Sequence, residues 1–199
     1  MNTTTGILER CRITVFSWRD SLSVRHKAEM ALLFAALTGI AAQLRLPLYG
    51  TPVPVTGQVF AVLMCGALLG GGWAELSMAF YVGLGFAGMP WFSGSAGGAA
   101  LTGVTGGYIL GFLPAALFIG FFAERVPSSA LRPLLLTLVM LGGVAVIYFF
   151  GALQFAAFTR SGISRTFSLA VIPFIPWDIA KALLAGLTAS AMLPRERRQ

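Results

Sequence analysis

Long apolar runs are the feature that most constrains what this chain can fold into. One of them, residues 133–158, holds no charged side chain. A helix needs about 20 predominantly apolar residues to cross the hydrocarbon core of a bilayer. The whole sequence is 57% hydrophobic and 11% charged, whereas a soluble domain averages about 25% charged residues. The sequence therefore predicts an all-α integral membrane protein and argues against a soluble protein with an unusually apolar core.

We expect one transmembrane domain, residues 28–193, between a cytoplasmic or interfacial segment, 1–27, and a basic cytoplasmic tail, 194–199. Six transmembrane helices are expected within it, at residues 28–46, 58–70, 73–88, 105–123, 133–158 and 167–193. The second and third of these are short for a crossing, so tilting, kinking or extension by flanking glycines is expected. Alternatively they form one interrupted hairpin, which makes five the rival count.

The distribution of basic residues indicates the orientation of the chain. If the N-terminus is cytoplasmic, only Arg45, Arg160 and Arg165 face outward. The inner side then receives Arg10, Arg12, Arg19, Arg25, Lys27, Arg125, Arg132, Arg195, Arg197 and Arg198. This excess agrees with the positive-inside rule, although the inner turn GGGW carries no basic residue. An even number of crossings places the C-terminus in the cytoplasm as well.

Several classes of function find no support in the sequence. The net charge is +7, but no basic face is interleaved with aromatic residues, so nucleic-acid binding is not expected. Neither Cys11 nor Cys65 belongs to a cluster of metal ligands. His26 is the only histidine and lies in the N-terminal region, so no base is available beside a buried nucleophile. We therefore expect no enzyme, no metal site and no cofactor.

Two charged residues interrupt the last apolar run. Asp178 and Lys181 are three residues apart and so lie on one face of a helix. A charge at the centre of the membrane costs roughly 3 kcal/mol on insertion scales. The two side chains could neutralise each other, or Lys181 could reach toward an interface. The alternative that we favour is a ligand-binding pair that faces a polar cavity inside the bundle.

Two of the expected outer connections have unusual compositions. The first, LPLYGTPVPVTGQ, contains three prolines and cannot be a regular helix. The second, MPWFSGSAGGAALTGVTGGY, is long and rich in glycine. Both are suited to ordered turns and so to loops that cover a pocket open to the outside, although structureless linkers have similar compositions. The aromatic residues of the second connection, Trp91, Phe92 and Tyr108, either pack against the rings of a ligand or anchor the chain at the membrane interface.

Small residues mark the first expected helix. Ala31 and Ala35 have the small-xxx-small spacing that lets another helix approach closely. The partner is either a helix of the same bundle or a separate membrane protein.

Four stretches of the sequence resemble the BioY family, the biotin-specific S components of energy-coupling factor (ECF) transporters. They are PVPVTGQVFAVLMCGALLG, GLGFAGMPWFSGSAGG, TGGYILGF and PFIPWDIAKALLA. The first and the last are specific in combination, whereas TGGY alone is a weak signal. Together they cover most of residues 53–112 and the last expected helix.

The resemblance implies a six-helix protein of the cell membrane that captures biotin from outside in a pocket closed by the first and third outer loops. Biotin would be bound by Asp178, Lys181, Thr56, Gln58, Ser93, Ser95, Tyr108 and Trp91. The family's small-residue motif, which docks on the transmembrane T component, corresponds to Ala31 and Ala35. A T component and a pair of ATPase subunits would supply the energy, since the sequence has no GxxxxGK[ST] motif of its own.

The chain departs from the family at two places. The family's third outer loop corresponds to the second connection described above, MPWFSGSAGGAALTGVTGGY. In the family this loop often carries Asn or Arg, but it reads FSGSAGG here, so Ser93 or Ser95 would have to replace those contacts. The family's arginines are also missing from the GGGW turn. The alternatives are a stand-alone biotin facilitator that works without ATPases, and an S component for another vitamin. The sequence leaves open whether copies of the chain associate with one another.

Overall fold

The computed structural model describes residues 21–93 and 97–194. Ser95, most of the expected N-terminal segment and the basic residues of the tail lie outside this part of the chain. Six helices of 12 residues or more are present within it: α2 (Val24–Gln43), α3 (Gln58–Leu69), α4 (Gly71–Phe86), α6 (Gly106–Ala123), α7 (Arg132–Thr159) and α9 (Ile175–Met192). Each of them overlaps one of the six expected spans.

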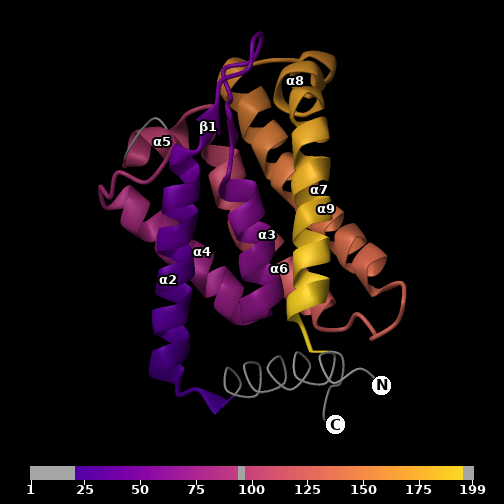
Figure 1. Ribbon diagram of the computed structural model, residues 1–199. Coiled ribbons are helices and arrows are strands. Elements are labelled where there is room, and N and C mark those ends of the chain that lie inside the picture. The colour runs from indigo at the N-terminus through magenta and orange to yellow at the C-terminus, as the bar shows by residue number, and fades with distance from the viewer. Residues whose placement is uncertain (1–20, 94–96, 195–199) are drawn as a thin grey trace.

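Shorter elements connect these helices at one end of the molecule. The described connections contain a two-stranded antiparallel ribbon, two short helices and a 3₁₀ turn: β1 (Arg45–Leu46), β2 (Val55–Thr56), α5 (Gly98–Thr102), α8 (Ile163–Ala170) and η1 (Ile172–Phe174). Each of the two outer connections thus contains regular structure, the first as a ribbon and the second as α5. Figure 1 shows β1, α5 and α8 at the upper end of the bundle.

The last expected span, residues 167–193, is divided into two helices, so its prediction as one continuous helix is wrong. The chain leaves the helical path between Ala170 and Ile175, in the short turn η1. Pro173 and Pro176 account for the break, because a proline inside a helix removes a hydrogen bond and collides with the preceding turn. The break places the charged residues of the last run in the first turns of α9.

The second and third expected spans are the two helices α3 and α4, and the alternative that they form one interrupted hairpin stays open. They meet at Gly70, whose φ of +83° is a conformation that glycine adopts without strain. Gly120 of α6 packs so closely against this turn that a Cβ atom there would collide with the backbone of Gly70 and Gly71. The tight turn therefore depends on glycines in two helices.

Within the described residues, three stretches are long and apolar enough to cross a membrane: Gly106–Ala123, Arg132–Thr159 and the combined stretch Ile163–Met192. Helix α3 is also apolar, but it has only 12 residues. The number of six crossings and the cytoplasmic termini therefore stay predictions.

The helices alternate in direction along the chain. In Figure 1 the start of α2, the turn between α3 and α4, and the end of α9 lie at the lower end, opposite the ribbon and α8. Helix α6 packs against α3, α4 and α7, and α9 packs against α3 and α7. The apolar core consists mainly of small and branched side chains from these helices. It leaves an opening at the upper end, where the loops and α9 meet.

Candidate functional site

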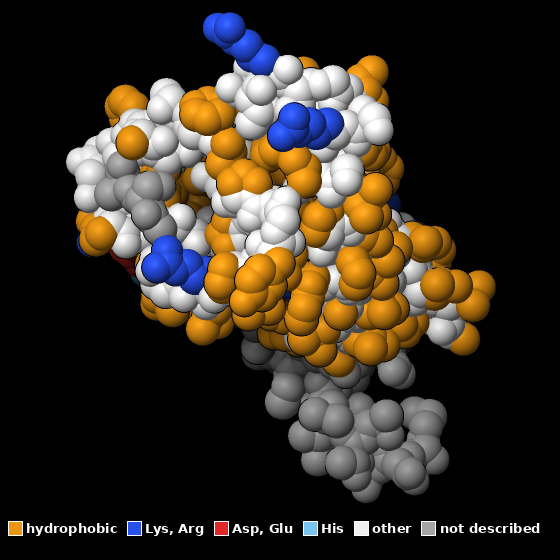
Figure 2. Space-filling model, turned by 90° about the horizontal axis from the view of Figure 1, so that it is seen from above, with side chains coloured by type: hydrophobic (Ala, Val, Ile, Leu, Met, Phe, Trp, Pro, Cys, Tyr) orange, Lys and Arg blue, Asp and Glu red, His pale blue; other side chains and the backbone are white. Residues whose placement is uncertain are grey.

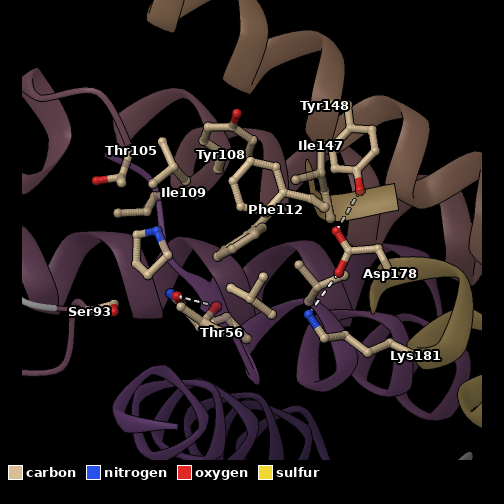
Figure 3. Close-up of a pocket in the computed structure, with 16 residues that line it drawn as sticks. Thr56, Ser93, Thr105, Tyr108, Ile109, Phe112, Ile147, Tyr148, Asp178 and Lys181 are labelled. Atoms are coloured by element: carbon tan, nitrogen blue, oxygen red, sulfur yellow. Dashed lines mark hydrogen bonds and ion pairs between the residues drawn. The ribbon is translucent and has the colours of Figure 1, made fainter. Parts of the chain in front are cut away.

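A pocket lies between the upper ends of α3, α6, α7 and α9, beneath the β1–β2 ribbon. It has about 580 Å³ of atom-free space, counting the part that opens to solvent. Its lining residues are Val53, Pro54, Val55, Thr56, Gln58, Val59, Ser93, Thr105, Tyr108, Ile109, Phe112, Ile147, Tyr148, Phe174, Asp178 and Lys181. Figure 3 shows a charged end and an uncharged polar end, separated by apolar side chains such as Phe112.

The charged end is formed by Asp178 and Lys181 on α9. Lys181 Nζ donates to Asp178 Oδ1 at 2.7 Å, and the side chains are 18% and 6% exposed, respectively. Asp178 lies in the first turn of the helix, where the helix dipole favours a negative charge. The two residues neutralise each other and also line a cavity, whereas their binding of a ligand stays a prediction.

Tyr148 of α7 completes this end of the pocket. Its hydroxyl donates to Asp178 Oδ2 at 2.7 Å, so each carboxylate oxygen accepts one hydrogen bond (Figure 3). Sequence reasoning missed this tyrosine, because it lies in an uninterrupted apolar run and no spacing distinguishes it. Only the packing of α7 against α9 brings it to the carboxylate.

The uncharged end is formed by residues of the two outer connections and the start of α3. Thr56 Oγ1 donates to Gln58 Oε1 at 2.9 Å. Ser93 Oγ is buried and has no hydrogen-bond partner among the described residues. A buried hydroxyl without a partner costs free energy unless a ligand or water completes it. Thr105, which also lines the pocket, was not singled out from the sequence.

Gln58 connects this end to the core of the bundle. Its Nε2 donates to the hydroxyl of Tyr81 at 2.6 Å, and that hydroxyl donates to the carbonyl of Trp91 at 3.2 Å. Trp91 Nε1 in turn donates to the carbonyl of Tyr81 at 3.0 Å. One donor and one acceptor of the Gln58 amide are thus engaged within the protein, and one of each is left for a ligand.

Trp91 is buried and does not line the pocket. Its ring lies against Gly39 of α2, where a Cβ atom would come within 2.7 Å of Trp91 Cβ. The adjacent Phe92 packs edge-on against Tyr81, with ring centroids 5.3 Å apart. Both aromatic residues therefore fix the start of the third outer loop to α2 and α4.

Tyr108 lines the pocket with its ring. Its hydroxyl donates to the carbonyl of Ala170 at 2.5 Å, which connects α6 to the end of α8. Phe174 packs beside it, with ring centroids 6.3 Å apart. The phenol hydroxyl is thus used within the protein, and the ring face is the part that a ligand can reach.

Ala31 and Ala35 are both 0% exposed and belong to the apolar core. Helix α2 packs there against α3 and α4. The two alanines thus pack within this bundle, and docking of α2 on a separate membrane protein stays a prediction. Within the described residues, no group of three or more His, Cys, Asp or Glu side chains is placed to hold a metal ion.

An apolar helical bundle whose pocket has apolar walls and two polar ends is typical of a membrane protein that binds a small molecule. Comparisons with known proteins narrow this class. The BioY family model matches residues 17–198. The chain is 38% identical to the probable biotin transporter BioY of Pyrococcus horikoshii, over 83% of this chain and 95% of that protein. It is 35% identical to the biotin transporter BioY of Thermotoga maritima, over 79% and 89% of the two chains.

The chain therefore belongs to the BioY family, as its motifs predict. A crystal structure described as the S-component for biotin from an ECF-type ABC transporter has the same fold, with a TM-score of 0.77 and 24% sequence identity. That likeness covers 85% of this chain and 93% of the other. The family and the apolar helices identify an integral membrane protein, and its relatives are transporters and not enzymes.

Proposed function

We propose that this chain is the biotin-binding S component of an ECF transporter in the cell membrane. It captures biotin from the outer side and delivers it inward together with a T component and ATPase subunits. The observation that carries the proposal is the Asp178–Lys181 pair, which lines a cavity and is held by Tyr148. The names of the relatives, biotin transporter BioY, supply the identity of the ligand.

The chemistry of biotin matches the pocket. Biotin has a ureido ring with donors and acceptors, a thioether ring, and an apolar tail that ends in a carboxylate. Asp178 can accept hydrogen bonds from N–H groups, while Lys181 can donate to a carbonyl or a carboxylate. Ser93 Oγ, which has no partner among the described residues, can donate at the opposite end. Ile109, Phe112 and other apolar residues between the two ends suit the rings and the tail.

The ribbon and the third outer loop would close the pocket from outside. Residues 53–56 of the first connection and Ser93 and Thr105 of the second all line the cavity. A loop with this composition can lie over a ligand when it is held by a rigid scaffold. The chain of hydrogen bonds from Thr56 to Trp91 supplies that support.

Binding by the purified chain tests the site. Asp178→Asn and Lys181→Ala should each weaken biotin binding by about 1.5–3 kcal/mol, the usual cost of a lost charged hydrogen bond. Tyr49→Phe, at an exposed tyrosine in the connection between β1 and β2, is the control and should bind like the wild type. Wild-type affinity in both site variants would refute the assignment. Titration with thiamine and riboflavin distinguishes biotin from other vitamins.

The need for partners is a separate question, because the relatives are named as transporters while the structural neighbour is named as one component. Uptake of biotin by cells that express the chain with and without the energising subunits decides it. Uptake only with the partners supports the proposal, whereas equal uptake by the chain alone supports a stand-alone facilitator.

The role of Ala31 and Ala35 in docking a T component stays a prediction. Ala35→Leu should spare biotin binding and impair transport if α2 docks on the partner. Because both alanines are buried, thermal unfolding has to be measured with the same variant. Equal loss of binding, transport and stability would mean that these residues only pack the bundle.

A further inference from the structure

The end of the molecule that holds the pocket carries three exposed arginines: Arg45, Arg160 and Arg165. None of their side chains is in an ion pair with another described residue. Figure 2 looks onto this end and shows basic side chains standing out from an apolar and uncharged surface. The described acidic residues other than Asp178 lie toward the opposite end, near the starts of α2 and α4 and the end of α6: Glu29, Glu75 and Glu124.

Each arginine belongs to an element that builds the pocket. Arg45 is paired with Thr56 across the antiparallel ribbon, and directly opposite side chains lie on the same face of a ribbon. Since Thr56 lines the pocket, Arg45 shares the face that covers it. Arg165 is on α8, whose last residue accepts the hydrogen bond from the pocket residue Tyr108.

Arg160 ends α7, the helix that supplies Tyr148 to the pocket, and it has a left-handed conformation with a φ of 52°. Its side chain is exposed. The three positive charges therefore lie at the end of the molecule that holds the pocket, on the ribbon, the end of α7 and α8.

The interior of the pocket carries no net charge of its own. Lys181 is neutralised by Asp178 at 2.7 Å, and the other polar lining residues are uncharged. An anion that approaches the pocket is therefore attracted mainly by the arginines outside it. The positive-inside rule gives no reason for basic residues on the outer side, so their presence there requires another explanation.

We propose that Arg45, Arg160 and Arg165 form a positively charged rim that speeds the capture of ligands with a free carboxylate. The proposal rests on the proposed function, because it concerns how a ligand such as biotin reaches the same pocket. A surface of one sign beside a cleft raises association rates by about 10- to 1,000-fold at low salt. Such rim charges act on the association rate and its salt dependence more than on dissociation.

Stopped-flow binding to the full chain in phosphatidylcholine nanodiscs tests the rim. The probes are biotin and biotinamide, which lacks the negative charge. The triple variant Arg45→Gln, Arg160→Gln, Arg165→Gln should associate with biotin about tenfold more slowly at low salt. The difference should vanish near 1 M salt, where the Debye length falls to about 3 Å. Dissociation of biotin and both rates for biotinamide should not change.

Arg25→Gln is the matched control, because Arg25 is exposed at the opposite end of the bundle. It should leave all rates unchanged. An unchanged association rate in the triple variant would overturn the proposal, and so would an equal loss for biotinamide. A loss that appears only in nanodiscs with anionic lipid would show that the arginines bind lipid phosphate instead. Absence of biotin binding to the wild-type chain would refute the proposed function itself.

Discussion

The contacts of Asp178 and Lys181 predict that removal of both charges destabilises the protein less than removal of either one. At 2.7 Å the attraction between two unit charges is roughly 6 kcal/mol for an effective dielectric constant of about 20. Transfer of each ion out of water costs several kcal/mol. The attraction and the two transfer costs are therefore of similar size, and the net contribution of the pair to folding is small.

Single substitutions disturb this balance because they leave one charge without its partner. Lys181→Met leaves a carboxylate that is 6% exposed in the wild type, with a hydrogen bond from Tyr148 alone. Asp178→Asn leaves an ammonium group that is 18% exposed and can move toward water on its flexible chain. Each should destabilise the protein by about 3–5 kcal/mol, with Lys181→Met the more costly. The double variant should lie within about 1 kcal/mol of the wild type.

Thermal unfolding of the ligand-free protein, followed by tryptophan fluorescence, measures the order of stabilities. For a chain of this size the single variants should unfold roughly 6–20 °C below the wild type. The double variant should unfold close to the wild-type temperature and yet fail to bind biotin. If it instead unfolds at a temperature lowered by the sum of the two single effects, the charges do not interact and the reasoning is refuted.

Three further substitutions test other contacts. Tyr148→Phe removes the hydrogen bond to the site carboxylate, so biotin affinity should fall about tenfold while Tyr49→Phe leaves it unchanged; equal titration curves for the two variants would contradict this. Gly151→Ala places a Cβ against the ring of Tyr108, so this pocket wall should shift and biotin binding should weaken, whereas wild-type affinity would show that the ring has room to move. Tyr81→Phe removes the hydroxyl that joins α3 to the third outer loop and should lower stability by about 1–3 kcal/mol, and an unchanged unfolding temperature would argue against that role.

The positions of the long helices could be predicted from the sequence, because a long apolar run indicates that the whole segment lies in apolar surroundings. Each expected span overlaps one of the helices of 12 residues or more, while the number of membrane crossings stays a prediction. The break before α9 was missed, although Pro173 and Pro176 mark it in the sequence. The long apolar run favoured one continuous helix in the prediction, although the two prolines oppose it.

The residues of the candidate site were predictable only where their chemistry is unusual for the membrane. The charged residues of α9 stand out because charges are costly in lipid, whereas Tyr148 resembles any other aromatic residue of α7. Trp91 shows the opposite difficulty, since an aromatic residue in a loop suits a ligand, an interface or a core equally well. Its burial against Gly39 depends on how closely the third outer loop approaches α2, and no pattern along one segment contains that distance.

The hydrogen bonds that run from Thr56 through Gln58 and Tyr81 to Trp91 tie the ribbon to the third outer loop. If the ribbon or the third outer loop moved alone, a polar group of this chain of hydrogen bonds would lose its partner. We therefore expect the ribbon and the third outer loop to move together when a ligand enters or leaves. A crosslink that immobilises one of them would then arrest the other.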